Sequence, residues 1–383
     1  MPTRRYFLDW LRVLAFGGLV LFHVGLMYSG WSYNLKSPVT YPAVEWLLEA
    51  LSPWRMALLF VISGVACRFL IGKLGPGGFA LDRLARLGPV ILTGMLLVNP
   101  LQVWVQLLAQ GDTAKGYLDF WLTSYLASDR AAMAALGRPM PTWDHLWFLV
   151  YLLPYTLLLA AVAAVLRRRA APAPPLGLLL VAPGIWMAAT DVLTGTVAPV
   201  THALYNDWGA HLKWLGLFAA GALLAPRDDA WAAIRSRRRT LLAAASGLLV
   251  AYLATRGAVL AQPDDLGWTL LYRSLQGAYG WTAVLAVAGF AAHWLDSPSA
   301  ALSYLNEAVL PVYVLHQPFM LGAAYLLFPL RLPLPVEAAL LLAAAGLAPL
   351  AAYHLAIRPW RPVRRMFGLK PAAAGPQQAP AAA

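Results

Sequence analysis

Residues 4–31 read RRYFLDWLRVLAFGGLVLFHVGLMYSGW, and this stretch indicates the fold class. A transmembrane helix needs roughly 20 mostly apolar residues to cross about 30 Å of hydrocarbon, and this stretch supplies them. Its length and its polar start differ from those of a cleavable signal peptide. It nevertheless carries Asp9, Arg12 and His23, whose ionisable side chains are costly inside a bilayer. We therefore expect a retained membrane span with a chemical role.

The composition extends this expectation to the whole chain. Of its 383 residues, 60% are hydrophobic and only 12% are charged, whereas soluble domains have about 25% charged residues. The formal net charge of +12 does not indicate nucleic acid binding, because the basic residues form short clusters between apolar runs, where they act as topology signals. The single cysteine, Cys67, excludes an internal disulfide framework and a cysteine-based metal cluster.

Apolar runs of roughly 20 residues recur along the chain and predict an all-α, polytopic membrane protein with about ten transmembrane helices. We expect one transmembrane domain over residues 1–366 and a low-complexity cytoplasmic tail over residues 367–383. The expected spans are residues 7–28, 53–72, 87–108, 145–166, 176–197, 208–225, 240–260, 273–294, 301–328 and 336–357.

The basic residues predict the orientation of these spans. With the N-terminus in the cytoplasm, most of the 29 lysines and arginines fall on the cytoplasmic side, including the runs at Arg167–Arg169 and Arg237–Arg239. The positive-inside rule then predicts that both termini are cytoplasmic. We expect a multi-pass protein of the cell (inner) membrane.

A stripe of ionisable residues is expected along the first span. Arg12 and His23 are eleven residues apart, which is three helical turns, so they share one face and lie about 16 Å apart along the axis. Asp9 is near this face and can pair with Arg12. A lone histidine in a span is often a packing residue, but one that shares a stripe with an arginine indicates a site.

Two further histidines fall at a similar depth in the bilayer. His145 opens the fourth predicted span from the outside, and His316 lies in the outer half of the ninth. Asn306 and Tyr313 are seven residues apart on that ninth span and share a face close to His316. Three histidines from three spans are therefore expected in the outer half, although their spacing alone does not bring them together.

The inner side of the protein has a different chemistry. The motif DRLARLGP (82–89) presents Arg83 and Arg86 at the cytoplasmic start of the third predicted span. Two guanidinium groups three residues apart on a helix suit bidentate capture of phosphate, so an anionic cytosolic ligand can dock there. The plainer alternative is that both arginines are ordinary anchors at the membrane surface.

Five motifs follow one another in a set order. They are FLDWLRVLAFGGLVLFHVGLMY (7–28), LLFVISGVACRFL (58–70), DRLARLGP (82–89), HLWFLVYLL (145–153) and LNEAVLPVYVLHQPFM (305–320). Together they resemble the family-3 membrane acyltransferases, multi-spanning enzymes that O-acylate extracytoplasmic glycans. The likeness is greatest to the branch of glucan biosynthesis protein C, a succinyltransferase of periplasmic glucans. One position departs from the family, because many relatives have an acidic residue where this chain has Met27.

The resemblance implies that an acetyl or succinyl group moves from cytosolic acyl-CoA to a sugar hydroxyl outside. His23 is the expected general base, and a transient acyl-histidine is the alternative. The further roles that the resemblance implies are hydrogen bonding to the thioester or acceptor by His145 and His316, donor binding by Arg12, Arg83 and Arg86, and support by Asp9, Trp147, Asn306 and Tyr313. Membrane lipid, acyl-CoA and a glycan or polysaccharide are the expected partners, without a metal or a permanently bound cofactor.

A transporter or flippase for a glycan or an anionic small molecule is the alternative function. It explains the spans and the intramembrane charges without a catalytic base. The sequence shows no clear inverted repeat of the kind that many transporters have, and its motifs follow the acyltransferase order. A sensor or scaffold without any chemistry is a third hypothesis. Label transfer from an acyl-CoA distinguishes the enzyme from both.

Overall fold

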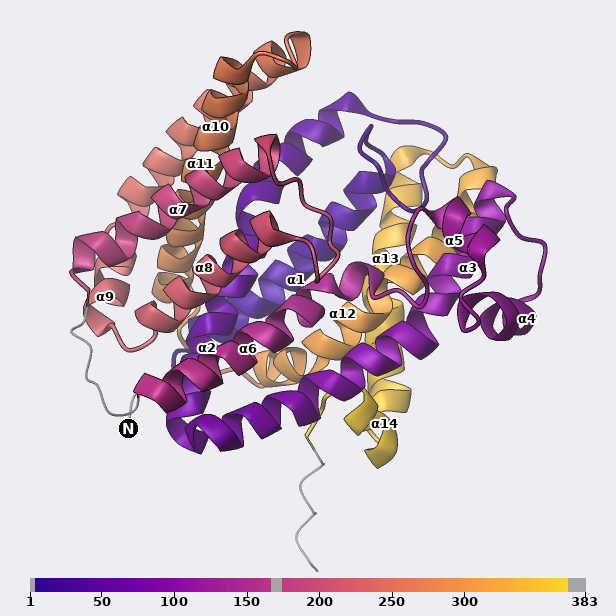
Figure 1. Cartoon of the computed structure of the whole chain (residues 1–383), viewed down its shortest axis with the longest axis horizontal. Coiled ribbons are helices and arrows are strands. Elements are labelled where there is room, and N and C mark those ends of the chain that lie inside the picture. The colour runs from indigo at the N-terminus through magenta and orange to yellow at the C-terminus, as the bar shows by residue number, and fades with distance from the viewer. Residues whose placement is uncertain (1–3, 167–173, 371–383) are drawn as a thin grey trace, which may run out of the picture.

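The computed structural model describes residues 4–166 and 174–370, which fold into helices without any strand (Figure 1). The α-helices are α1 (Tyr6–Met27), α2 (Pro42–Thr93), α3 (Asn99–Gln110), α4 (Tyr117–Asp119), α5 (Arg130–Leu136), α6 (Trp147–Leu166), α7 (Leu176–Thr196), α8 (Trp208–Leu224), α9 (Asp228–Ser236), α10 (Arg238–Ala261), α11 (Leu266–Trp294), α12 (Ala300–Leu327), α13 (Leu334–Ala352) and α14 (Arg361–Met366). Shorter 3₁₀- and π-helical turns are η1 (Gly94–Val98), η2 (Phe120–Tyr125), η3 (Asp144–Leu146), η4 (Phe328–Leu330) and η5 (Tyr353–Ile357).

The prediction of an all-α, multi-spanning membrane protein is confirmed. Within the described residues, 8 helical segments are long and apolar enough to cross a bilayer. The count is lower than ten for two reasons. The predicted spans 53–72 and 87–108 share one continuous segment, Pro42–Gln110, and the predicted span 208–225 is α8, which has only 17 residues. The basic run Arg167–Arg169 and most of the expected tail (371–383) lie outside the described residues.

A break at Gly75 divides the segment Pro42–Gln110 into two arms. Gly75 has φ 70° and ψ 167°, and Pro76 follows it. This backbone region is open essentially only to glycine, and proline removes a helical hydrogen bond at the same place. The two predicted spans are therefore separated by a bend and not by a loop.

Replacing Gly75 with alanine should strain this bend by about 1–3 kcal/mol, because a Cβ is disfavoured at its backbone angles. We expect the thermal unfolding midpoint of the detergent-solubilised protein to fall by about 2–5 °C. Gly77→Ala is the matched control, since a Cβ there has no neighbour within 4 Å. Equal midpoints for the two variants would show that the bend does not depend on glycine.

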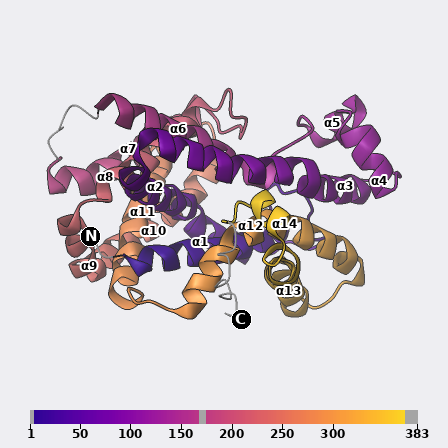
Figure 2. The same cartoon turned by 90° about the horizontal axis from the view of Figure 1, so that it is seen from below.

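Helix α1 lies at the centre of the molecule. It packs on α2, α11, α12 and α13, while α7, α9, α10 and α11 lie at one end and α3, α4 and α5 at the other (Figures 1 and 2). Its buried residues Leu11, Ala15 and Leu19 recur every four positions and face these neighbours, whereas Leu14 and Leu21 are more than half exposed. One face of α1 is therefore buried in the protein, while the apolar side chains of the other face are exposed, as expected for a helix that is hydrophobic all round and contacts lipid.

Helices α2 and α8 approach each other closely, and this contact fixes their relative position in the bundle. A Cβ on Gly64 would lie 2.0 Å from the carbonyl oxygen of Phe218, and one on Gly221 would lie 2.0 Å from that of Val61. Small residues at such crossings let two backbones touch, which is how membrane helices gain packing energy without a hydrophobic driving force. The contact holds α2, and with it Arg55, against the bundle.

Candidate active site

The three predicted histidines meet in one cluster. His23 comes from α1, His316 from α12 and His145 from η3. The rings of His23 and His316 are nearly parallel, with centroids 5.2 Å apart, and His23 Nδ1 lies 2.9 Å from His316 Nε2. The ring of His145 stands almost perpendicular to that of His316, also at 5.2 Å. Segments separated by more than a hundred residues thus build one imidazole cluster, which we call the histidine cluster.

Hydrogen bonds assign the protons in this cluster. His316 Nδ1 lies 2.6 Å from the carbonyl oxygen of Tyr313, which can only accept, so Nδ1 carries the proton. In the neutral ring His316 Nε2 then has the lone pair and accepts the Nδ1 proton of His23. The lone pair of His23 is therefore on Nε2. His23 is also half-buried, whereas His316 is fully buried.

In His145 the proton is on the other ring nitrogen, Nε2. Its Nε2 donates to the carbonyl oxygen of Val314 at 3.1 Å, and its Nδ1 is buried without a partner among the described residues. Tyr313 donates its hydroxyl proton to the backbone carbonyl of His145 at 2.5 Å. The N–H groups of neutral His145 and His316 are thus both used by main-chain carbonyls. Neither of them is free to donate to a substrate oxygen.

Arg12 and Asp9 do not form the pair that the sequence suggested, so this prediction is wrong. Asp9, in the first turn of α1, forms an ion pair at 2.7 Å with Arg4, which lies just before the helix. Arg12 Nη1 instead donates to Asn306 Oδ1 at 3.3 Å, and Asn306 Nδ2 donates to Asp9 Oδ1 at 3.4 Å. The amide of Asn306 therefore connects the guanidinium to the carboxylate.

The predicted arginines line two adjoining cavities. Arg12, Arg83 and Arg86 line a cavity of about 270 Å³, together with Asn306 and side chains of α2, α6 and α12. Arg12 also lines a second cavity of about 790 Å³, whose other charged residues are Arg4, Arg5, Asp9, Arg68 and Lys73. Asp82 pairs with Arg83 and Asp9 with Arg4, so positive charge remains in excess. We call the two spaces the cationic cavities, and their charge suits a polyanionic ligand.

Trp147 lies apart from the histidine cluster. Its ring packs on those of His202 at 4.9 Å, Tyr151 at 5.6 Å and Trp214 at 6.0 Å. These contacts join α6 to α8 and to the loop before it, so Trp147 holds the framework of the site.

A polar group beside the histidines was not foreseen. Asp144 accepts hydrogen bonds from Gln102 at 2.6 Å, Arg138 at 3.0 Å and Asn34 at 3.3 Å. We call these four residues the Asp144 cluster. It is joined to the histidine cluster through Gln317, the neighbour of His316, whose amide lies 3.5 Å from Asn34 Oδ1. Sequence spacing gives no signal for a group assembled from two loops, the helix α3 and the turn η3.

The loop after α1 carries Tyr33 over His23. The two ring centroids are 5.7 Å apart, and Lys36 holds the loop by donating to the carbonyl oxygens of Leu26, Ser29 and Trp31. Burial raises the pKa of the Tyr33 hydroxyl well above its usual range, so it stays neutral. This hydroxyl has no hydrogen-bond partner among the described residues, and it is available to a ligand.

Arg55 is a further residue that sequence reasoning missed. It is 7% exposed and lies at the start of the apolar run of α2, where it contacts Phe22, the neighbour of His23. The rule that singled out Arg12 and His23, that an ionisable group at membrane depth marks a site, applies equally to it.

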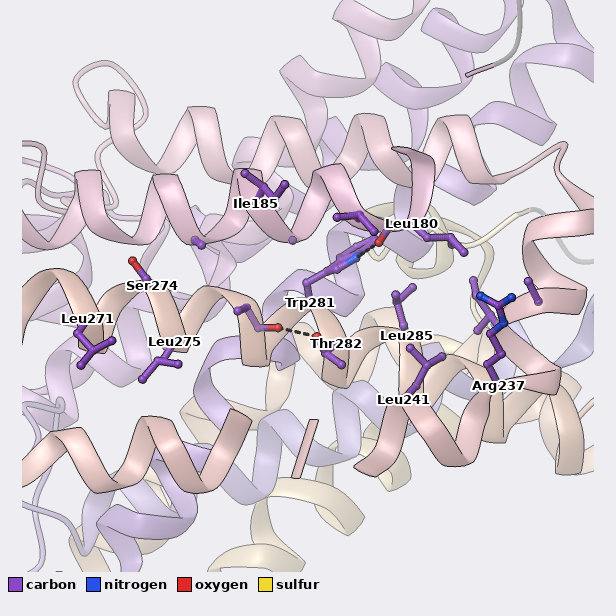
Figure 3. Close-up of a pocket in the computed structure, with 16 residues that line it drawn as sticks. Leu180, Ile185, Arg237, Leu241, Leu271, Ser274, Leu275, Trp281, Thr282 and Leu285 are labelled. Atoms are coloured by element: carbon purple, nitrogen blue, oxygen red, sulfur yellow. Dashed lines mark hydrogen bonds between the residues drawn. The ribbon is translucent and has the colours of Figure 1, made fainter. Parts of the chain in front are cut away.

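A separate, apolar cavity of about 630 Å³ lies between α7, α9, α10 and α11 (Figure 3). Arg237 is its one charged lining residue, and Trp281 crosses it to donate to the carbonyl oxygen of Leu180 at 2.6 Å. None of the predicted site residues lines this cavity. It therefore belongs to the framework and not to the histidine cluster.

Comparison with known proteins identifies relatives of this chain. Residues 5–354 match the family described as "Acyltransferase domain". The chain is 26% identical over 342 residues to the glucans biosynthesis protein C of Escherichia coli O139:H28, which covers 83% of this chain and 82% of that protein. It is 25% identical over 344 residues to the protein of the same name from Salmonella schwarzengrund, with 83% of both chains covered. No solved structure matches.

Proposed function

Because this chain belongs to the acyltransferase family that matches residues 5–354, we propose that it moves an acyl group from acyl-CoA to a hydroxyl of an extracytoplasmic glycan, with His23 as general base. The chain is a multi-pass membrane acyltransferase, and its donor, acceptor and base are the proposal. The observation that carries it is the lone pair on His23 Nε2, in a ring that is half-buried and held at its other nitrogen by His316. Family membership also favours the enzyme over a transporter or flippase.

The reaction needs one group that first accepts the proton of the acceptor hydroxyl and later gives it to the leaving thiolate. His23 Nε2 removes the proton of the acceptor hydroxyl as its oxygen attacks the thioester carbonyl. The tetrahedral intermediate then collapses, the carbon–sulfur bond breaks, and the leaving thiolate takes the proton back from His23. The bond from His23 Nδ1 to His316 strengthens while His23 is charged, because hydrogen bonds from ionised donors are stronger than neutral ones.

The donor binds at the cationic cavities. CoA carries several phosphate charges, and arginine is the residue that pairs best with phosphate because its planar fork donates two parallel hydrogen bonds. Arg83 and Arg86 hold these phosphates, and Arg12 lines both cavities. In the topology expected from the basic residues, these cavities face the cytoplasm and the histidine cluster lies in the outer half.

The acceptor binds at the Asp144 cluster. The loops that carry this cluster fall on the outer side in the expected topology, and sugar hydroxyls are recognised by carboxylates and amides of this kind. Gln102 Oε1 and the Tyr33 hydroxyl have no partners among the described residues and remain available to such hydroxyls. The relatives' name, glucans biosynthesis protein C, supports a glucan as acceptor.

Transfer of label tests the proposal directly. Membranes that contain the protein are incubated with acetyl- or succinyl-CoA labelled in the acyl group and with a glucan oligosaccharide. We expect labelled oligosaccharide, identified by mass spectrometry, and none from membranes without the protein. Uptake of the unmodified oligosaccharide into vesicles, without label transfer, would instead support transport.

Replacing Asp144 with asparagine should weaken acceptor binding. The change keeps the shape of the side chain but removes a charge that accepts three hydrogen bonds. Because hydrogen bonds to charged groups contribute about 1.5–3 kcal/mol, we expect the KM for the oligosaccharide to rise about 10- to 100-fold, with the KM for the donor unchanged. The exposed Asp112 provides the control variant, Asp112→Asn. An increase confined to the donor KM would contradict the assignment of this cluster.

A further inference from the structure

Arg55 is a buried cation that has no anionic partner among the described residues. Its side chain leaves α2 beside α1, and it is only 7% exposed. Its Nε and Nη1 atoms are buried and have no hydrogen-bond partner among the described residues, where none of the ion pairs includes Arg55. The titratable groups that interact with its charge are the hydroxyls of Tyr33 and Tyr313 and the imidazoles of His23 and His316, and none of them is a carboxylate.

An unpaired buried cation destabilises the protein unless another group compensates its charge. Burying an unpaired ion costs several times what a surface ion pair gains. The ring of Phe22, 3.6 Å from the guanidinium carbon, offers a cation–π contact, but this interaction is too weak to replace the lost hydration. Other buried cations in the protein have partners, for example Lys213 with Asp191 and Arg364 with Glu307. The orphaned guanidinium therefore indicates a ligand that carries negative charge.

The position of Arg55 relative to His23 narrows the choice of ligand. Phe22 and His23 are consecutive on α1, so their side chains point about 100° apart around the helix. Arg55 stacks on Phe22, while Tyr33 covers His23. The guanidinium thus lies over the residue next to the base in α1. A negative charge carried by the transferred group, which must reach the base, fits this position.

We propose that Arg55 binds the free carboxylate of a dicarboxylic acyl group, of which succinyl is the type, and selects it over acetyl. The inference rests on the proposed acyl transfer and identifies the class of acyl donor. A carboxylate matches the guanidinium fork with two parallel hydrogen bonds, and it brings the permanent charge that the resting protein lacks.

Two substitutions and two donors test this assignment. Arg55→Met keeps an unbranched side chain without charge, and Arg55→Lys keeps the charge without the fork. With succinyl-CoA, we expect kcat/KM to fall about 100-fold in Arg55→Met and about tenfold in Arg55→Lys, since loss of one partner of a buried charge pair is costly. With acetyl-CoA, Arg55→Met should stay within about threefold of the native protein. Equal losses with both donors, or none with either, would overturn the assignment.

Stability and binding give readouts that do not need turnover. If Arg55 were merely structural, its loss would destabilise the protein, but removal of an unpaired buried charge should leave the thermal midpoint of Arg55→Met equal or higher. Succinyl-CoA should stabilise the native protein more than acetyl-CoA does, and this difference should vanish in Arg55→Met. If native membranes transfer neither group, the acyltransfer proposal fails, while the binding difference still decides whether Arg55 recognises a carboxylate. A lower midpoint, or an unchanged binding difference, would refute that role.

Discussion

Replacing His23 with alanine is expected to abolish acyl transfer, with kcat lowered by about 10²- to 10⁴-fold, the range that general base catalysis contributes. The substitution removes the nitrogen that accepts the proton of the acceptor hydroxyl. It also frees His316 Nε2, which accepts from His23 in the native protein. The KM values for both substrates should change little, because the imidazole acts mainly in the transition state. Initial rates with labelled acyl-CoA and oligosaccharide measure all three quantities.

The exposed His354 supplies the control for this experiment. His354→Ala removes an imidazole that contacts Tyr304, away from the histidine cluster, and should keep the native rate. Thermal unfolding must show that His23→Ala is folded. A His23→Ala variant that modifies its glycan at the native rate would refute the base assignment.

A covalent route is separable from general base catalysis by the same reagents. If an acyl-histidine forms, native protein incubated with labelled donor and no acceptor should retain label on His23 after denaturation. General base catalysis predicts no retained label. The arrangement of the lone pair on His23 Nε2 is compatible with either route, so this measurement decides between them.

Replacing Arg83 and Arg86 together with glutamine should raise the KM for acyl-CoA by at least about 100-fold, because each charged hydrogen bond to phosphate contributes about 1.5–3 kcal/mol. Both residues line the smaller cationic cavity with Arg12. The value of kcat at saturating donor should change much less, since the phosphates lie away from the reacting thioester. Initial rates over a series of donor concentrations separate the two parameters.

Arg239→Gln is the matched control for the double variant. Arg239 is exposed and lines neither cationic cavity, so its loss should leave the donor KM unchanged. Raised salt should weaken donor binding to the native protein more than to the double variant, because fewer charges remain to be screened. If the double variant lowers kcat without raising the donor KM, Arg83 and Arg86 do not bind the donor.

The fold class and much of the candidate site were predictable from the sequence. Apolar runs identify membrane helices reliably, because a bilayer requires roughly 20 apolar residues per span whatever the tertiary structure. The cost of burying charge then singled out Arg12 and His23. The described residues contain 8 such segments where about ten spans were predicted, since the bend at Gly75 joins two predicted spans and α8 has only 17 residues.

The amino-acid sequence is sufficient to predict that this protein crosses the membrane several times and carries imidazoles and arginines at membrane depth, because hydrophobicity and charge are local properties of the chain. How the helices pack brings His23, His145 and His316 together, places Asn306 between Asp9 and Arg12, and leaves Arg55 without an anion among the described residues. These are relations between distant segments, set by how helices pack. No local pattern encodes which nitrogen keeps its lone pair or which cation lacks a partner.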